Sequence, residues 1–306
     1  MKPVTGYSMV AAAALCWGLS ATAAKTLLNQ SVSTVLLVQM RATFAAAVMA
    51  AFLALVKPHL LRVRVGDLWR FALLGILGVA GANFTYYFAI REGTVAVAIV
   101  LQYTAPLLVM AYAAWTREEQ VTRIKVIAAV VALAGCFLAV GGFGGEGVAH
   151  TSPAGLASGI LSAFCFGFMT VYTRHLLERY SVWTVTCYAL ISAAGFWLIF
   201  NPPWKVAAQS PDVSTWWALA GLAMVSVLIP HSLYFGGLRH VVSSRAIIVA
   251  TLEPVIAIVS AALVIGEALT ALQFCGAALV LAAIIGLHSR SEPGGEEIRG
   301  GANATE

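Results

Sequence analysis

Apolar segments long enough to cross a lipid bilayer fill almost the whole of this 306-residue chain. A bilayer core of about 30 Å requires roughly 20 consecutive apolar residues in a helix. Only 10% of the residues are charged, whereas soluble domains carry about 25%. We therefore expect an all-α protein embedded in the lipid bilayer. Its ten transmembrane helices are predicted at about residues 6–28, 33–56, 67–90, 94–116, 122–141, 154–177, 181–201, 215–238, 244–265 and 268–288.

The same sequence argues against several other classes of protein. The net charge of +5 comes from Lys and Arg residues spread between the apolar segments, so we predict no nucleic-acid partner. The five cysteines lie inside apolar segments without paired spacing, and the six histidines are scattered, so we predict no metal site and no cofactor. The motifs GxxxxGK[ST], HExxH and GxSxG do not occur. We do not expect an enzyme.

An internal repeat is the most specific feature of the sequence. Residues 86–122 align without gaps with residues 234–270 at an offset of 148, and residues 6–28 align with residues 155–177 at an offset of 149. Chance matches are common in sequences rich in Ala and Leu, but matched Pro, Gly, Cys, Tyr and charged positions are not. The matched pairs include Cys16 and Cys165, Gly18 and Gly167, Tyr86 and Tyr234, Arg91 and Arg239, Pro106 and Pro254, and Glu119 and Glu267.

The repeat predicts two five-helix halves of opposite orientation, because an odd number of helices turns the second copy over. We place the first half at residues 1–143, a linker at 144–153, the second half at 154–288 and a disordered cytoplasmic tail at 289–306. Positive residues accumulate in cytoplasmic loops. With both termini in the cytoplasm, all of the 18 Lys and Arg residues lie on that side except Lys25, Arg41, Arg91 and Lys205. Inverted repeats are typical of secondary transporters.

The repeated motifs resemble those of the EamA-type, ten-helix members of the drug/metabolite transporter superfamily. The resemblance rests on Trp17-Gly18 with Lys25, on Tyr86-Tyr87-Phe88-Ala89 through Pro106, and on residues 243–246, 252–255 and 265–276. The first half carries Glu118-Glu119 where the family has Gly-Glu, a mild departure. The resemblance implies a transporter of small solutes with a central cavity lined by both halves. The family includes exporters of amino acids, drugs and other metabolites, so it leaves the substrate open.

The repeat also pairs a polar residue and aromatic rings in each half. Asn83 aligns with His231, and rings follow three and four residues later, Tyr86 and Tyr87 in the first half and Tyr234 in the second. A polar group and a ring on one helix face suit a small amphipathic substrate. The alternative is packing between helices, with hydrogen bonds from Asn and His to their neighbours.

Two further residues are candidates for the cavity wall. Arg41 lies eight residues into its predicted helix, roughly 12 Å along the axis. It could bind a substrate carboxylate through two parallel hydrogen bonds, or instead extend to the outer interface or pair with an acid. Trp17 lies deep in the first helix and is a candidate for an aromatic wall, although aromatic residues in membrane helices often serve in packing.

Pro106 and Pro254 lie within the fourth and ninth predicted helices. Proline cannot donate the backbone hydrogen bond of its turn, so it leaves the carbonyl four residues earlier free. The carbonyls of Gln102 and Ala250 could then contact substrate or permit bending; a static kink is the alternative. Gln102 and Tyr103, next to Pro106, are further candidates for the substrate site.

Glu253 lies about ten residues into the ninth predicted helix, where an ionised carboxylate is costly. It must be paired, face a water-filled cavity, or be protonated. A carboxyl that gains and loses a proton there could couple transport to a proton gradient. A structural hydrogen bond from protonated Glu253 to a neighbouring helix is the alternative.

These features predict a secondary active transporter that moves small amphipathic metabolites across the inner membrane by alternating access, with amino-acid export as the favoured activity. Efflux of drugs or cations and a channel-like facilitator are the alternatives. An intramembrane lipid enzyme fits less well, because its ionisable groups would cluster at one interface. Protons are the candidate coupling ion, and a monomer and a homodimer are equally compatible with the sequence.

Overall fold

The computed structural model describes residues 3–29, 32–141, 151–209, 212–265 and 270–289, and every regular element in these ranges is helical. Most of the predicted linker, the tail from residue 290 and Glu267 lie outside the described residues. In the first half the elements are α1 (Pro3–Asn29), α2 (Thr34–Val56), η1 (Pro58–Leu61), η2 (Val65–Asp67), α3 (Leu68–Leu73), η3 (Leu74–Gly81), α4 (Ala82–Arg91), α5 (Val95–Gln102), α6 (Ala105–Thr116) and α7 (Arg123–Ala139).

The second half follows the same order. Its elements are α8 (Pro153–Leu177), α9 (Val182–Phe200), α10 (Pro203–Ala208), α11 (Val213–Ala223), η4 (Met224–Leu228), α12 (Ile229–Leu238), α13 (Ser243–Val249), α14 (Leu252–Ile265) and α15 (Ala271–Ser289). Side-chain caps define where many helices begin. The residue before each of these helices accepts a hydrogen bond from a backbone N–H three residues later, which satisfies a free donor of the first turn. These capping residues are Ser33, Thr94, Thr122, Ser152, Ser181 and Asp212.

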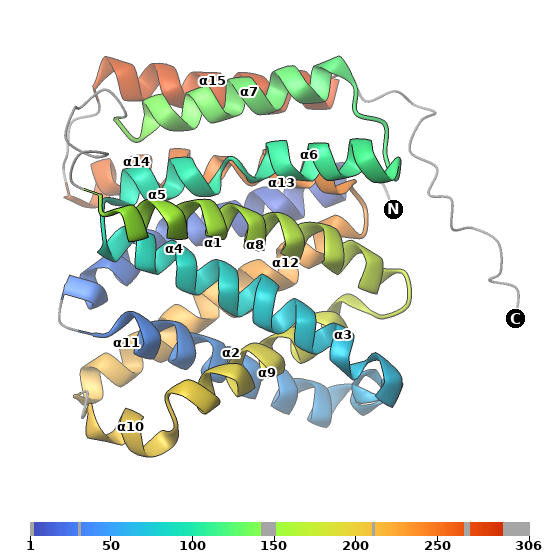
Figure 1. Cartoon of the computed structure of the whole chain (residues 1–306), viewed down its shortest axis with the longest axis vertical. Helices are drawn as coiled ribbons and strands as arrows, with labels where there is room; N and C mark the ends of the chain where they lie inside the picture. Colours follow the sequence, from blue (N-terminus) through green and yellow to red (C-terminus); the bar gives the residue numbers. More distant parts are fainter. Residues whose placement is uncertain (1–2, 30–31, 142–150, 210–211, 266–269, 290–306) are drawn as a thin grey trace, which may run out of the picture.

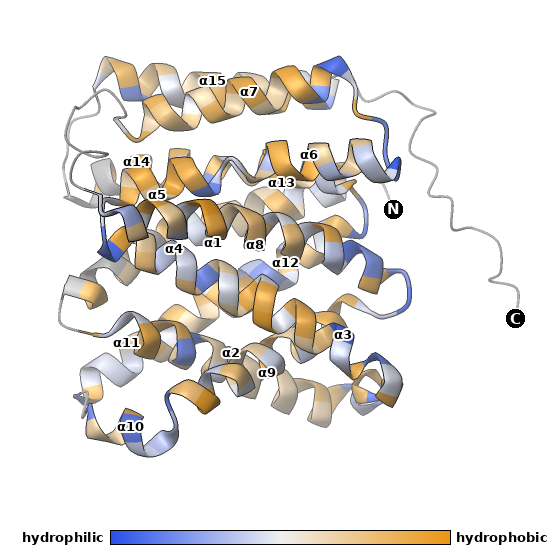
Figure 2. Ribbon diagram, in the orientation of Figure 1, coloured by the Kyte–Doolittle hydropathy of each residue, from blue (hydrophilic) through white to orange (hydrophobic). Residues whose placement is uncertain are grey.

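Within the described ranges, eight helical segments are long and apolar enough to cross a membrane. The two other predicted spans are α1, whose apolar stretch Val4–Ser20 is shorter, and α7, which has 17 residues. That α1 and α7 also cross the membrane, which would bring the number of spans to ten, therefore stays a prediction. Large apolar side chains point outward on many helices, for example Leu55 and Leu263, which are 85% and 81% exposed. Figure 2 shows hydrophobic residues along the helices and hydrophilic residues mainly near their ends. This surface fits a lipid environment.

Equivalent helices of the two halves make reciprocal contacts across the interface. The first helix of the first half, α1, packs on α12 and α14 of the second half, and its counterpart α8 packs on α4, α5 and α6 of the first (Figure 1). Two further helices of the first half pair with their own counterparts, α2 with α9 and α7 with α15. This reciprocal packing is what a pseudo-twofold axis between the halves requires.

Equivalent helices run in opposite directions, which establishes the inversion. In the pair α2 and α9, the Gln39 amide donates to the Asn201 carbonyl over 2.8 Å, while Thr184, near the start of α9, donates to Leu60, just beyond α2, over the same distance. In the pair α7 and α15, Gly135 lies against Gly276 and Ala128 shares an apolar cluster with Leu287. Both pairs are antiparallel.

The helices that contain the repeated prolines are each divided in two, whereas the sequence predicted continuous helices over 94–116 and 244–265. A turn at Tyr103 and Thr104 separates α5 from α6, and one at Ala250 and Thr251 separates α13 from α14. Pro106 consequently lies in the first turn of α6. A backbone N–H in the first turn has no acceptor within the helix, so proline costs no hydrogen bond there. Wider π-helical turns also occur at equivalent places, η3 and η4; such turns often mark functional sites.

Candidate functional site

A cavity of about 60 Å³ lies between the two halves. It has room for a few water molecules. Both halves contribute to its wall, through α1, α2, α4 and α5 on one side and α8, α12 and α14 on the other. Its lining residues are Trp17, Ser20, Arg41, Ala82, Asn83, Tyr86, Tyr87, Gln102, Phe166, Met169, His231 and Glu253.

The structure brings most of the residues proposed from the sequence into this one cavity. The predicted residues that line it are Trp17, Arg41, Asn83, Tyr86, Tyr87, Gln102, His231 and Glu253. The other four predicted residues are buried and are not part of the lining, namely Tyr103, Pro106, Tyr234 and Pro254.

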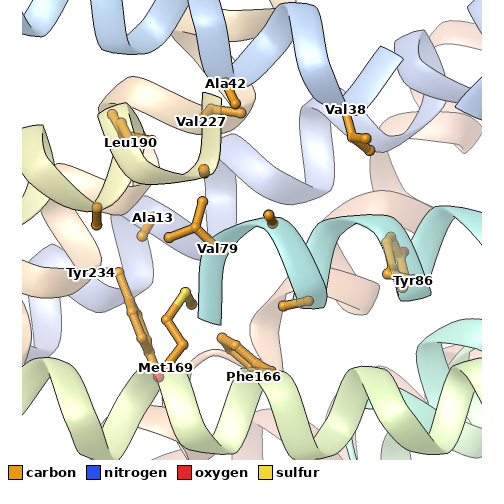
Figure 3. Packing of buried hydrophobic residues seen from close by; sticks show 14 of the residues in the cluster. Ala13, Val38, Ala42, Val79, Tyr86, Phe166, Met169, Leu190, Val227 and Tyr234 are labelled. Carbon is orange, nitrogen blue, oxygen red and sulfur yellow. The ribbon is translucent and has the colours of Figure 1, made fainter. Parts of the chain in front are cut away.

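Four lining residues were not predicted: Ser20, Ala82, Phe166 and Met169. The repeat contained the signal for one of them, Phe166, because its counterpart Trp17 was predicted. At the offset of 149, Trp17 aligns with Phe166 and Ser20 with Met169. Figure 3 shows Phe166 and Met169 pointing from α8 toward the helix that carries Val79 and Tyr86.

Asn83 and His231 occupy equivalent positions and make equivalent hydrogen bonds. The Asn83 side-chain amide donates to the Val79 carbonyl over 2.9 Å, and Nδ1 of His231 lies 2.8 Å from the Val227 carbonyl. Because a carbonyl only accepts, Nδ1 carries a hydrogen and Nε2 is the acceptor of the neutral ring. Both acceptors lie in the π-helical turns. Each side chain is therefore oriented by its own helix and not by a neighbouring helix.

Trp17 stands at the centre of an aromatic cluster. Its ring centroid lies 5.7 Å from that of His231 and 6.1 Å from that of Phe166, both edge to face, and 5.4 Å from that of Tyr234. The Tyr234 hydroxyl lies 2.8 Å from the Thr170 hydroxyl, so its polar end is already occupied. Tyr234 supports the wall from behind.

Arg41 is only 2% exposed, so it does not extend to the outer interface. Its Nε–H donates to the Ser226 hydroxyl over 2.8 Å, and Nη2 lies 3.5 Å from the Ser226 carbonyl. The guanidinium carbon lies 4.8 Å from the ring centroid of Tyr87, within range of a cation–π interaction. No carboxylate of the described residues lies within 4.0 Å of it.

Glu253 meets Tyr103 where the two divided helices cross. The Tyr103 hydroxyl lies 2.7 Å from Oε2 of Glu253 and 2.9 Å from the Ala250 carbonyl. Pro254 has no N–H for the Ala250 carbonyl, which instead accepts a hydrogen bond from the Glu253 backbone N–H over 3.0 Å and lies beside the Tyr103 hydroxyl. At the offset of 148 the counterpart of Glu253 is Ala105. The carboxyl is thus present in one half alone.

Polar contacts join the halves beyond one end of the cavity. The Glu119 carboxylate accepts hydrogen bonds from the Ser244 hydroxyl and from its backbone N–H, the latter over 3.1 Å. Lys125 Nζ lies 3.0 Å from the same carboxylate, and both charged side chains are largely buried. Nearby, Arg174 donates to the Val241 carbonyl over 3.0 Å. The two hydrogen bonds from Ser244 to Glu119 hold the start of α13 against the first half, whereas the contact of Arg174 with Val241 lies within the second half.

The model of the EamA-like transporter family matches residues 4–141 and again residues 153–288. The chain belongs to the EamA-like transporter family. Its two matches coincide with the two helical halves, so each half is one copy of the family's repeat.

Several curated proteins of this family are similar to the chain. The uncharacterized inner membrane transporter YicL of Salmonella typhimurium is 26% identical over 285 residues, which cover 92% of this chain and 94% of that protein. The threonine/homoserine exporter RhtA of Salmonella typhimurium is 27% identical over 71% of each chain, and RhtA of Escherichia coli K12 is 26% identical over 76% of each. The family and the apolar helices together make the chain a multi-pass membrane transporter.

A protein of known crystal structure shares the fold. It aligns with a TM-score of 0.76 at 21% sequence identity, over 94% of this chain and 97% of that one. At this identity the likeness concerns the arrangement of the helices alone.

Proposed function

We propose that this chain is a secondary active transporter that exports small amphipathic metabolites, amino acids among them, by alternating access. The observation that carries the proposal is a polar and aromatic cavity at the interface of two inverted halves, lined by both. Two halves related by an in-plane axis can exchange conformations, and each exchange opens the shared cavity to the other side of the membrane. The distribution of Lys and Arg between the loops supports a cytoplasmic location of both termini.

The lining supports a small amphipathic substrate. Rings of Trp17 and Phe166 offer apolar surface, while Arg41, Asn83 and Gln102 offer hydrogen bonds. The similarity to threonine/homoserine exporters supports amino acids within this class. A volume of about 60 Å³ leaves little space for a substrate in the present conformation, so the halves must separate on one side before it enters.

The surroundings of Glu253 support proton coupling. The Tyr103 hydroxyl has a single hydrogen but two oxygen neighbours, Oε2 of Glu253 and the Ala250 carbonyl. With Glu253 ionised, the Tyr103 hydrogen bonds Oε2, and the Ala250 carbonyl keeps its hydrogen bond from the Glu253 backbone N–H. With Glu253 protonated, its own hydrogen bonds Tyr103 and the Tyr103 hydrogen bonds the Ala250 carbonyl, so the contact survives in both states. Glu253 also lies in the first turn of α14, whose helix dipole favours the ionised form. Both protonation states therefore have support.

The inter-half contacts support a gate at one end of the cavity. Glu119, Lys125 and Ser244 lie in or beside the loops that the positive-residue rule assigns to the cytoplasm. The hydrogen bonds between Ser244 and Glu119 join the two halves on that side in the present conformation. We infer that they separate when the cavity opens inward to load substrate.

The test is transport by purified protein in proteoliposomes, with a panel of L-amino acids and a panel of lipophilic cations. We expect counterflow of amino acids and uphill movement when an inward proton gradient is imposed. Transport of the cations with an inert amino-acid panel would replace amino-acid export by drug efflux. Transport that equilibrates but never accumulates, and shows no counterflow, would indicate a channel-like facilitator.

A further inference from the structure

Arg41 is held rigidly although it lies inside a cavity. Its Nε–H is directed to the Ser226 hydroxyl, which in turn donates to the Leu222 carbonyl. Pro230 follows Ser226 by four residues and lacks the N–H that would bond the Ser226 carbonyl in an α-helix; Nη2 of Arg41 lies beside that carbonyl instead. The ring of Tyr87 fixes the guanidinium from the first half. The cation is thus positioned by both halves.

One nitrogen of this group has no partner. Nη1 of Arg41 is fully buried and makes no hydrogen bond to any described residue. The Tyr86 hydroxyl, also on the cavity wall, is buried and unpartnered in the same way. A buried donor without an acceptor costs about 1–3 kcal/mol, more when it is charged, so such groups are expected to meet a ligand or water.

We propose that Nη1 of Arg41 is the subsite for a carboxylate of the transported solute. This inference rests on the proposed function and adds the group by which the substrate is selected. A guanidinium binds carboxylates through short, charge-assisted hydrogen bonds, and Nη1 is the donor left for one. The Tyr86 hydroxyl is available as a second donor on the same wall.

The charge balance of the cavity favours a solute that also carries a positive group. Arg41 and Glu253 both line the cavity and belong to different halves, yet they do not form an ion pair with each other. A solute with a carboxylate at Arg41 and an ammonium toward Glu253 would satisfy both charges. A dianion would bring excess negative charge toward Glu253, and an amine without a carboxylate would leave Nη1 unpaired in a buried site.

The experiment compares three probes of one skeleton with wild-type protein in proteoliposomes. L-threonine carries both charged groups, 1-amino-2-propanol lacks the carboxylate, and N-acetyl-L-threonine lacks the ammonium. Each is tested as an inhibitor of L-threonine counterflow, and each is also tested for raising the melting temperature of the detergent-solubilised protein. We expect L-threonine to act at concentrations at least tenfold lower than 1-amino-2-propanol, and N-acetyl-L-threonine to act between them.

The variants are R41M, R41K and the matched control R91M, in which the exposed Arg91 at the end of α4 receives the same substitution. We expect R91M to behave as wild type. R41M should raise the KM for L-threonine at least tenfold and remove the preference over 1-amino-2-propanol. R41K keeps the charge but lacks the fork of donors, so it should retain a weakened preference; this variant gives the answer if R41M does not fold.

Two results would overturn the inference in distinguishable ways. If wild-type protein responds equally to L-threonine and 1-amino-2-propanol, or if R41K keeps the full preference, the chain transports solutes but Arg41 does not select a carboxylate. If no solute of any panel moves or stabilises the protein, the proposed function itself is wrong, and the inference falls with it.

Discussion

The hydroxyl of Tyr103 lies 2.7 Å from Oε2 of Glu253. Tyr103 is in the turn between α5 and α6, and Glu253 is in the first turn of α14, just after the break that separates it from α13. Tyr103 belongs to the first half and Glu253 to the second. Both residues are buried, Tyr103 completely and Glu253 at 6% exposure. A change of protonation at Glu253 therefore alters a contact on which the relative position of the two halves depends.

The variant E253Q should uncouple transport from the proton gradient. Glutamine keeps the shape of the side chain and can bond Tyr103, but it cannot exchange a proton. We expect counterflow of L-threonine to persist within about fivefold of wild type, which corresponds to roughly 1 kcal/mol, while the stimulation by an inward pH gradient disappears. Counterflow and gradient-driven accumulation are measured in the same proteoliposomes. An unchanged response to the gradient would remove Glu253 from the coupling step.

The variant H231N should be tolerated better than H231F. Asparagine at this position can donate to the Val227 carbonyl as Asn83 donates to the Val79 carbonyl, whereas phenylalanine keeps a ring but loses the donor. One buried hydrogen bond contributes about 1 kcal/mol, so we expect the KM of H231F to exceed that of H231N about fivefold. The opposite order would show that the ring contact with Trp17 matters more than the hydrogen bond.

The variant E119Q should destabilise the protein more than E118Q. Glu119 is the buried partner of Lys125 and of Ser244, whereas the Glu118 side chain is 43% exposed. Leaving Lys125 without its counter-charge should cost about 1–3 kcal/mol of stability. Losing the exposed contact of Glu118 with His175 should cost less than about 0.5 kcal/mol. Thermal unfolding in detergent distinguishes them. Equal melting temperatures for the two variants would contradict a gate at Glu119.

The variant G276A should loosen the pair formed by α7 and α15. A Cβ at Gly276 would lie 2.6 Å from the Gly135 carbonyl and 2.8 Å from Cα of Ala139, both backbone atoms that cannot move aside. We expect a loss of about 1–3 kcal/mol, as for other overpacked contacts. G286A on the same helix is the control, because a Cβ there meets no atom of the described residues within 4 Å; it should be neutral or stabilising by about 0.5–1 kcal/mol. Equal effects would mean that the helices are not in close contact at Gly276.

Much of the fold followed from the sequence because hydropathy and the repeat are both local or periodic signals. The all-α membrane architecture, the family and the two repeats are confirmed. The division of two predicted helices was not foreseen. Proline at position 106 or 254 is compatible with a kink or a new helix start, and the choice depends on contacts such as that of Tyr103 with Ala250. The π-helical turns escaped prediction for the same reason.

The candidate site was predicted best where the repeat supplied a pair. Asn83 and His231 were singled out together and face one cavity, while Phe166 was left out although the offset of 149 makes it the counterpart of Trp17. Tyr103 illustrates the limit of the method. Its sequence position suggests the cavity, yet its hydroxyl is occupied by groups 147 and 150 residues away, contacts that no local pattern contains. The binding role of all these residues stays a prediction.

The counterpart of Glu253 in the first half is Ala105, which cannot carry a proton, and this limits the energetics of the proposed cycle. With Glu253 as the carboxyl of the described cavity wall, one proton at most is exchanged there for each solute. One pH unit then sustains a concentration ratio of about ten. If the solute is electrically neutral overall, each turn also carries one positive charge inward, so a voltage of 100 mV adds about 2.3 kcal/mol. Such a carrier would slow when the membrane is depolarised, even at constant pH.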